Sequence, residues 1–107
     1  MYDWKWSDAE KKLAHSVYEG ARLAELAETL AEFKARVAAT PTVDEMWPLE
    51  EYLRSKRREL DDKYQYRYSR LPWLFAQLIR EGRVEPARLT GLSQEKLSEI
   101  LRMASPR

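Results

Sequence analysis

Apolar residues recur at steps of three and four along the first third of the chain. The resulting stripe contains Leu23, Leu26, Leu30, Phe33 and Val37. This spacing places its members on one face of an α-helix. No proline interrupts the stretch before Pro41, and Ser7-Asp8-Ala9-Glu10 has the form of a capping box. The pattern therefore predicts a long helix over residues 7–39, and Gly20 leaves open the alternative of two shorter helices.

The length of this helix favours a second copy of the chain. About 31 residues at 1.5 Å each give roughly 46 Å. A compact chain of 107 residues has a diameter of about 34 Å. The helix would extend beyond its own domain, so we expect a homodimer that buries the stripe.

A second long helix is predicted over residues 44–66. Thr40-Pro41-Thr42 breaks the first helix, and Pro48 suits a first helical turn because its missing N–H is unpaired there anyway. One face is apolar and carries Met46, Leu49, Leu53, Leu60 and Tyr64. The other face offers i,i+4 ion pairs between Glu50 and Arg54, Arg57 and Asp61, Arg58 and Asp62, and Glu59 and Lys63. We assign Met46, Leu49 and Leu53 to the dimer interface together with the stripe.

The last third predicts a small head of three short helices over residues 70–103. Pro72 can open the first, and Gly82 can end it. Pro86 can open a further turn, and Ser93 is a suitable N-cap for the last helix. The tail from Ala104 to Arg107 is expected to fray. The fold class is therefore all-α, as one domain over residues 1–107: an elongated homodimer of two long helices with this head.

Composition narrows the possible functions. Charged residues make up 35% of the chain, mean hydropathy is -0.70, and the net charge is +1. With so small a net charge, the electrostatic field of the whole molecule would not attract nucleic acid or an anionic membrane. The absence of cysteine excludes disulfides, thiolate catalysis and Cys-ligated metals. We expect a cytoplasmic protein with no export signal and no membrane span.

The sequence offers little for catalysis, so we expect no enzyme, no metal and no cofactor. His15 is the only histidine. His15 and Glu19 have metal-ligand spacing, but two ligands do not make a site. Glu50 and Glu51 are adjacent and would point about 100° apart on a helix, which suits acid–base catalysis poorly. No glycine-rich phosphate loop is present.

The segment Lys63-Tyr-Gln-Tyr-Arg-Tyr-Ser-Arg70 mixes aromatic and basic residues, as nucleic-acid-binding proteins do. Acidic residues one turn earlier argue against that use. We therefore interpret the segment as a structural tyrosine cluster and regard nucleic-acid binding as the less favoured alternative. Trp47 has three interpretations: core packing, a dimer contact or an anchor for a partner.

Several segments resemble the fluorescence recovery proteins of cyanobacteria. They are Trp47-Pro-Leu-Glu-Glu-Tyr-Leu-Arg-Ser-Lys-Arg-Arg-Glu-Leu-Asp-Asp-Lys-Tyr-Gln-Tyr-Arg67, Phe75-Ala-Gln-Leu78, Glu81-Gly82, Trp6-Ser7 with Glu10, and Leu89-Thr-Gly-Leu92. The resemblance implies an all-helical, elongated homodimer that is not an enzyme. It also implies binding to the C-terminal domain of the photoactivated orange carotenoid protein. Such binding speeds the return of that protein from its red to its orange form and ends phycobilisome quenching.

The resemblance also implies where a partner binds. The functional patch of the family falls on Trp47, Glu51 and Arg57, and its contact in the head falls on Trp73. We add the neighbouring Glu50 and Arg54 to this candidate surface. Three positions depart from the family pattern: Glu50 replaces His, Glu51 replaces Asp, and Asp62 replaces a frequent Gly. Two glutamates add negative charge where a partner would dock, and the family includes members from bacteria without phycobilisomes.

Overall fold

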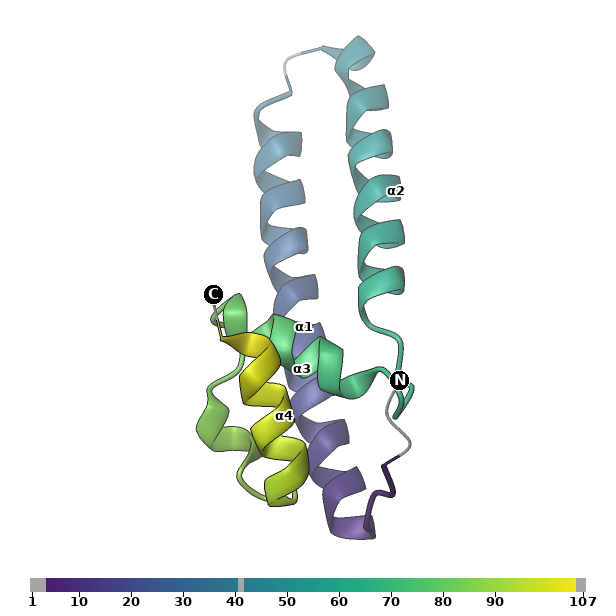
Figure 1. Ribbon diagram of the computed structural model, residues 1–107. Helices are drawn as coiled ribbons and strands as arrows, with labels where there is room; N and C mark the ends of the chain where they lie inside the picture. The colour runs from purple at the N-terminus through teal and green to yellow at the C-terminus, as the bar shows by residue number, and fades with distance from the viewer. Residues whose placement is uncertain (1–3, 41, 106–107) are drawn as a thin grey trace. The chain divides into compact units, whose positions relative to one another are not determined.

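The computed structural model describes residues 4–40 and 42–105. All regular elements within these ranges are helical, which confirms the all-α class (Figure 1). The elements are α1 (Asp8–Ala38), the 3-10 turn η1 (Val43–Glu45), α2 (Met46–Lys63), α3 (Leu71–Arg80), the 3-10 turn η2 (Pro86–Leu89) and α4 (Gln94–Ala104). No helix in the described part of the chain is long and apolar enough to cross a membrane.

The first predicted helix is observed as α1, which runs unbroken for 31 residues. Gly20 lies inside it, so the alternative of two shorter helices is wrong. The capping box has the expected geometry: the amide of Glu10 donates to Ser7 Oγ at 3.1 Å, and the amide of Ser7 donates to Glu10 Oε1 at 3.0 Å. These two bonds satisfy N–H groups that the first turn of a helix leaves unpaired.

The second long helix is shorter than predicted. The prediction of residues 44–66 is corrected at both ends, because the chain enters through η1 and α2 ends at Lys63. Tyr64 leaves helical geometry at φ -97 and ψ 63, while its amide still donates to the Leu60 carbonyl at 2.9 Å. Two residues later, the Tyr66 ring packs edge-on against Tyr18 with ring centroids 4.8 Å apart. Tertiary packing of the tyrosines, which helical spacing cannot reveal, thus accompanies the end of α2.

The chain divides into two compact units. Unit 1 combines residues 1–21 with residues 65–107, and unit 2 spans residues 22–64. The first part of α1 therefore belongs to unit 1 and the remainder to unit 2. The assignment of residues 1–107 to one domain stays a prediction, and each unit is described by itself.

The core of unit 1 is assembled from α1, α3, η2 and α4. Its largest fully buried side chains are Phe75, Leu71, Leu78, Leu89, Ile100, Val17 and Pro72.

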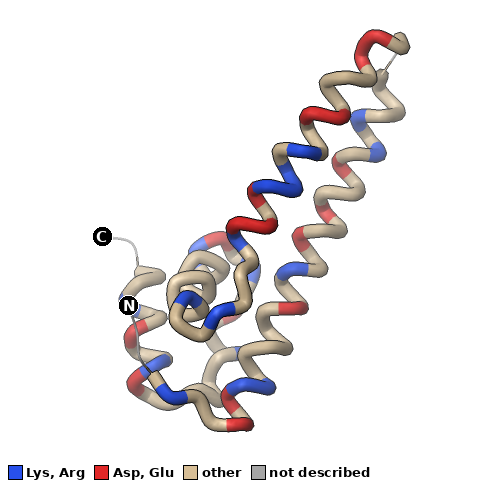
Figure 2. Tube along the Cα trace, turned by 90° about the vertical axis from the view of Figure 1, so that its right-hand side faces the viewer, with Lys and Arg blue, Asp and Glu red and all other residues tan. Residues whose placement is uncertain are grey.

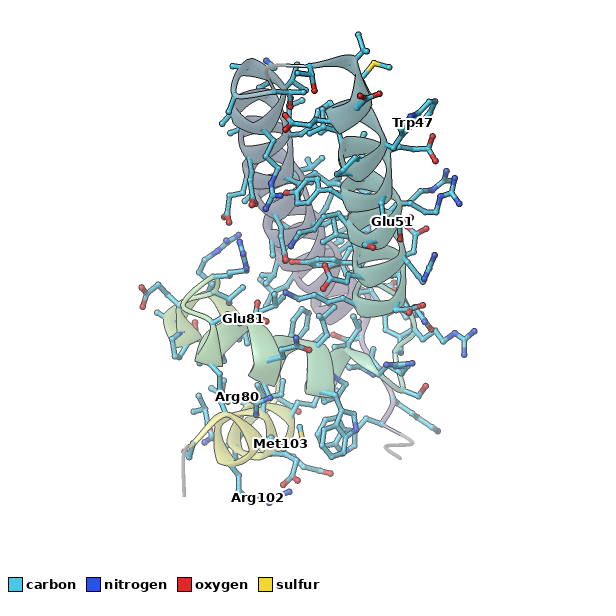
Figure 3. All side chains as sticks on the ribbon, turned by 90° about the horizontal axis from the view of Figure 1, so that it is seen from above. Trp47, Glu51, Arg80, Glu81, Arg102 and Met103 are labelled. Atoms are coloured by element: carbon cyan, nitrogen blue, oxygen red, sulfur yellow. The ribbon has the colours of Figure 1, made fainter. Side chains whose placement is uncertain are left out.

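Gly82 ends α3 with a φ of 75°, a left-handed conformation that glycine adopts without a Cβ penalty. Arg80 Nη1 then donates to the Met103 carbonyl at 2.7 Å, which ties α3 to the end of α4 (Figure 3). The head predicted over residues 70–103 is observed here as α3, η2 and α4. The prediction that the tail frays from Ala104 onward is wrong at Ala104, which is the last residue of α4 and is buried, whereas residues 106–107 lie outside the described range.

A buried ion pair connects α1 to α4 within unit 1. Lys96 Nζ donates to Glu10 Oε1 at 3.2 Å, with 7% and 11% of the two side chains exposed. The amide of Ser93 donates to Glu10 Oε2 at 2.8 Å. One carboxylate therefore caps α1 and also holds the start of α4. The Lys96 ammonium lies 5.2 Å from the Trp6 ring centroid and 5.9 Å from that of Trp4, at distances suited to cation–π attraction.

In unit 2 the remainder of α1 runs antiparallel to α2 (Figure 1). Glu25 Oε1 accepts hydrogen bonds from Lys63 Nζ at 2.8 Å and from Tyr64 Oη at 2.6 Å. Farther along, the Arg36 guanidinium lies 4.1 Å from the Tyr52 ring centroid. Leu60 and Tyr64 are buried, whereas much of the apolar surface of this hairpin is not.

Candidate functional site

Trp47 projects from the first turn of α2 and is 66% exposed. The interpretation of Trp47 as a core residue is therefore wrong. Glu51 follows one helical turn later on the same face, and both side chains point away from α1 (Figure 3). Tryptophan is among the residue types that most often anchor protein interfaces. The arrangement suits contact with another protein surface, either a second copy or a partner.

The charged candidates lie on the same helix and are strongly exposed. Arg54 Nη2 contacts Glu50 Oε1 at 2.7 Å, and Arg57 Nε lies 3.8 Å from Asp61 Oδ2. Both pairs match the predicted i,i+4 spacing. Exposed pairs of this kind contribute little to stability, so their charges remain available to a partner. The structure thus brings together Trp47, Glu50, Glu51, Arg54 and Arg57 on α2.

The other predicted pairs on α2 are rearranged. Glu59 contacts Lys56 at 3.4 Å, instead of the predicted Lys63. Lys63 instead contacts Glu25 on α1 at 2.8 Å. The i,i+4 rule concerns neighbours on one helix, whereas Lys63 finds a better-shielded carboxylate on another. Asp62, the predicted ion-pair partner of Arg58, is exposed.

Trp73 belongs to α3 in unit 1 and is therefore described apart from the α2 residues. Its side chain is 56% exposed, although its neighbours Pro72 and Leu74 are buried. An exposed indole in the most apolar helix of the head suits contact with another molecule.

The residues predicted for the dimer interface are largely uncovered in the single chain. Leu23 and Leu30 are 54% and 53% exposed, and Phe33 and Leu49 are half-buried. The remaining exposed members are Leu26, Val37, Met46 and Leu53. Apolar side chains exposed in a stripe along one helix are typical of a contact surface.

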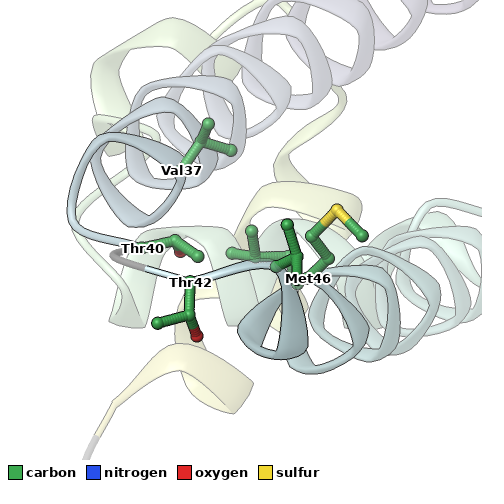
Figure 4. A pocket seen from close by; sticks show the side chains of 6 residues that line it. Val37, Thr40, Thr42 and Met46 are labelled. Atoms are coloured by element: carbon green, nitrogen blue, oxygen red, sulfur yellow. The ribbon is translucent and has the colours of Figure 1, made fainter.

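An open hollow of about 340 Å³ lies at the turn between α1 and α2, within unit 2 (Figure 4). Its lining consists of Val37, Thr40, Thr42, Val43, Met46 and Leu49. Three of these residues were assigned to the dimer interface from sequence. The sequence did not predict Val43 as part of this lining. Val43 lies in a short 3-10 turn, and helical periodicity does not detect an apolar residue in such a turn.

Two tyrosines of the segment, Tyr66 and Tyr68, belong to an aromatic cluster in unit 1. The Tyr66 ring lies 5.5 Å from Tyr68 and 5.6 Å from the edge-on ring of His15. Tyr68 in turn lies 5.4 Å from Trp6. Burial, with a hydrogen bond to Tyr68, raises the pKa of Tyr66. These contacts favour the structural interpretation, since the rings that would stack on bases are already engaged with one another.

The described residues offer no metal centre, because no three histidine, cysteine or acidic side chains are grouped for one there. His15 packs against Tyr66 instead. Glu50 pairs with Arg54, and the adjacent Glu51 points to solvent (Figure 3).

Comparisons with known proteins agree with these observations. A family model described as "Photoprotection regulator fluorescence recovery protein" matches residues 6–104. The fluorescence recovery protein of Synechocystis sp. (strain ATCC 27184 / PCC 6803 / Kazusa) is 38% identical over 99 residues, which are 92% of this chain and 91% of that protein. The structure of the Fremyella diplosiphon protein superposes with a TM-score of 0.85 at 32% identity. The Synechocystis structure gives a TM-score of 0.85 at 38% identity. Each superposition covers 94% of this chain and 98% of the other.

Proposed function

The chain belongs to the fluorescence recovery protein family of photoprotection regulators, and from this we propose that it is a cytoplasmic, non-enzymatic regulator. It binds the C-terminal domain of an orange carotenoid protein and accelerates the reversion of that protein from red to orange. Phycobilisome quenching then ends. The observation that carries the proposal is the family match, which extends over residues 6–104.

The proposed mechanism is differential binding. A partner speeds a conformational return only if it binds the compact arrangement, or the barrier leading to it, more tightly than the open state. Trp47 serves as the anchor, because its exposed indole can be buried in the complex. Glu50, Glu51, Arg54 and Arg57 provide orientation and specificity through their charges. Trp73 provides a separate contact from the head.

We also propose that the regulator is a homodimer held by the apolar face of unit 2. Its exposed leucines support this arrangement, because a second copy can cover the same face by two-fold symmetry. Leu30→Glu places a charge in that face, and burying it unpaired is costly. The variant should be monomeric by light scattering at concentrations where the original chain is dimeric. An unchanged dimer would refute the assignment of this face.

The function is tested by mixing the protein with photoactivated orange carotenoid protein and following the red-to-orange absorbance change in the dark. We expect faster recovery. Trp47→Ala should weaken binding by about 2 kcal/mol, roughly thirtyfold, as for an interface anchor. Light scattering provides the control, since Trp47→Ala should leave the dimer intact. A lack of acceleration by the original chain at high concentration would contradict the proposal and direct the search to another protein partner.

A further inference from the structure

Two exposed apolar side chains frame the beginning of α2. Val43 in η1 is 71% exposed, and Trp47, four residues later, is 66% exposed. Both exceed the exposed fraction of Met46, which lies between them in sequence and lines the hollow together with Val43. Apolar side chains grouped at one end of a hairpin mark a surface that another molecule covers.

The charges along this region are arranged in bands. Residues 43–53 contain Asp44, Glu45, Glu50 and Glu51 and no basic residue. Residues 54–58 contain Arg54, Lys56, Arg57 and Arg58 and no acidic residue. Figure 2 shows this change from red to blue along α2. Trp47 therefore lies within an acidic band, and the basic residues begin almost two helical turns later.

Contacts within the chain account for only one member of this acidic band, Glu50, which pairs with Arg54 at 2.7 Å. Asp44, Glu45 and Glu51 are exposed, and among the described residues they make no ion pair. Asp44 and Glu45 also suit the start of a helix, where acidic residues interact favourably with the helix dipole. Glu50 and Glu51 lie beyond the first turn, where that effect has largely decayed. The excess negative charge around Trp47 therefore persists at the surface.

We propose that the tip surface, defined as Val43, Asp44, Glu45, Trp47, Glu50 and Glu51, docks a protein whose apolar hollow is rimmed by lysine or arginine. The partner hollow receives the indole of Trp47, and its cations face the acidic band. This proposal rests on the proposed function, because it gives the chemistry of the surface that the carotenoid-protein domain presents here. It adds Asp44 and Glu45 to the residues that determine specificity.

The test measures association with the isolated C-terminal domain of an orange carotenoid protein at about 20 mM and about 500 mM salt, where screening differs strongly. The tip variant is Asp44→Asn with Glu45→Gln. The matched control is Glu59→Gln with Asp62→Asn, which removes the same charge from α2 beyond the basic band. The tip variant should associate about three to ten times more slowly at low salt, and the control less than about twofold. At high salt the tip variant and the original chain should converge.

Several outcomes would overturn the proposal. Equal slowing by both variants would mean that only total charge matters, and faster association of the tip variant would mean that the partner surface is acidic. A tip variant that dissociates into monomers would assign the surface to the second copy. If the original chain fails to bind the domain, the proposed function and this proposal both fall. If the original chain binds and the tip variant binds equally fast, only this proposal falls. Helical circular dichroism would verify that each variant is folded.

Discussion

Removing the charge of Glu10 should destabilise unit 1 far more than removing any carboxylate from α2. In Glu10→Gln the nearly buried Lys96 ammonium loses its carboxylate partner, which lies 3.2 Å away. Breaking one side of a buried ion pair costs about 3–5 kcal/mol. Lys96 keeps its contacts with the rings of Trp6 and Trp4, and such contacts contribute about 0.5–2 kcal/mol. The net cost should therefore be about 1–4.5 kcal/mol.

Thermal unfolding followed by circular dichroism measures this cost. At about 4–8 °C per kcal/mol for a domain of this size, Tm should fall by roughly 4–36 °C. Glu99→Gln is the matched control, because Glu99 pairs with Arg102 at the surface of α4. Loss of an exposed pair should change stability by less than about 1 kcal/mol.

A double-mutant cycle separates the ion pair from other effects. Glu10→Gln combined with Lys96→Met removes both charges, so the double variant should lose less stability than the sum of the two single variants. A cost of Glu10→Gln no larger than that of the Glu99 control, or additive single effects, would show that the buried pair does not stabilise unit 1.

The same carboxylate gives stability a dependence on pH. The amide N–H of Ser7 lowers the pKa of Glu10 most, and the amide of Ser93 and the Lys96 ammonium lower it further, against burial, which raises it. The folded pKa therefore lies below the unfolded value of 4.5. The stabilisation is fully present above pH 4.5 and is lost as pH falls through the folded pKa. Urea midpoints of the original chain and of Glu10→Gln should accordingly converge at the acidic end of a pH series.

Two glycines should respond oppositely to alanine in the same thermal assay. Gly20 lies in the interior of α1 with no atom within 4 Å of an added Cβ, so Gly20→Ala should stabilise the protein by about 0.5–1 kcal/mol through helix propensity. In Gly91→Ala the new Cβ would lie 2.9 Å from Leu13 Cδ2. Displacing that side chain should cost about 1–3 kcal/mol. Equal Tm changes for the two variants would contradict this interpretation of the local packing.

The helices were predictable because their signals are local. The three- and four-residue spacing from Leu23 to Val37, the capping box of Ser7 and Glu10, and the turn glycine Gly82 each act within a few residues. Similarly, Trp47, Glu51 and Arg57, which the family resemblance singles out, fall within the helix predicted over residues 44–66. The family resemblance was also visible in the chain, since it depends on residue identities and not on their arrangement in space.

The partners of individual side chains were not predictable in this way. Lys63 pairs with Glu25, 38 positions away in the chain, instead of with the neighbour that helical spacing offers. Lys96 and Glu10 meet across 86 positions. Charged side chains have several acceptable partners along one helix, and burial between helices determines which pair is favoured.

The sequence by itself determined the helical class, the approximate ends of the helices and the family. The tertiary structure decided which apolar side chains are covered and which remain exposed. Helical periodicity marks the stripe from Leu23 to Val37 in the same way whether another element covers it or not. Helical periodicity could not decide whether Trp47 is a core residue or a surface anchor. Burial depends on what the rest of the chain places against a side chain.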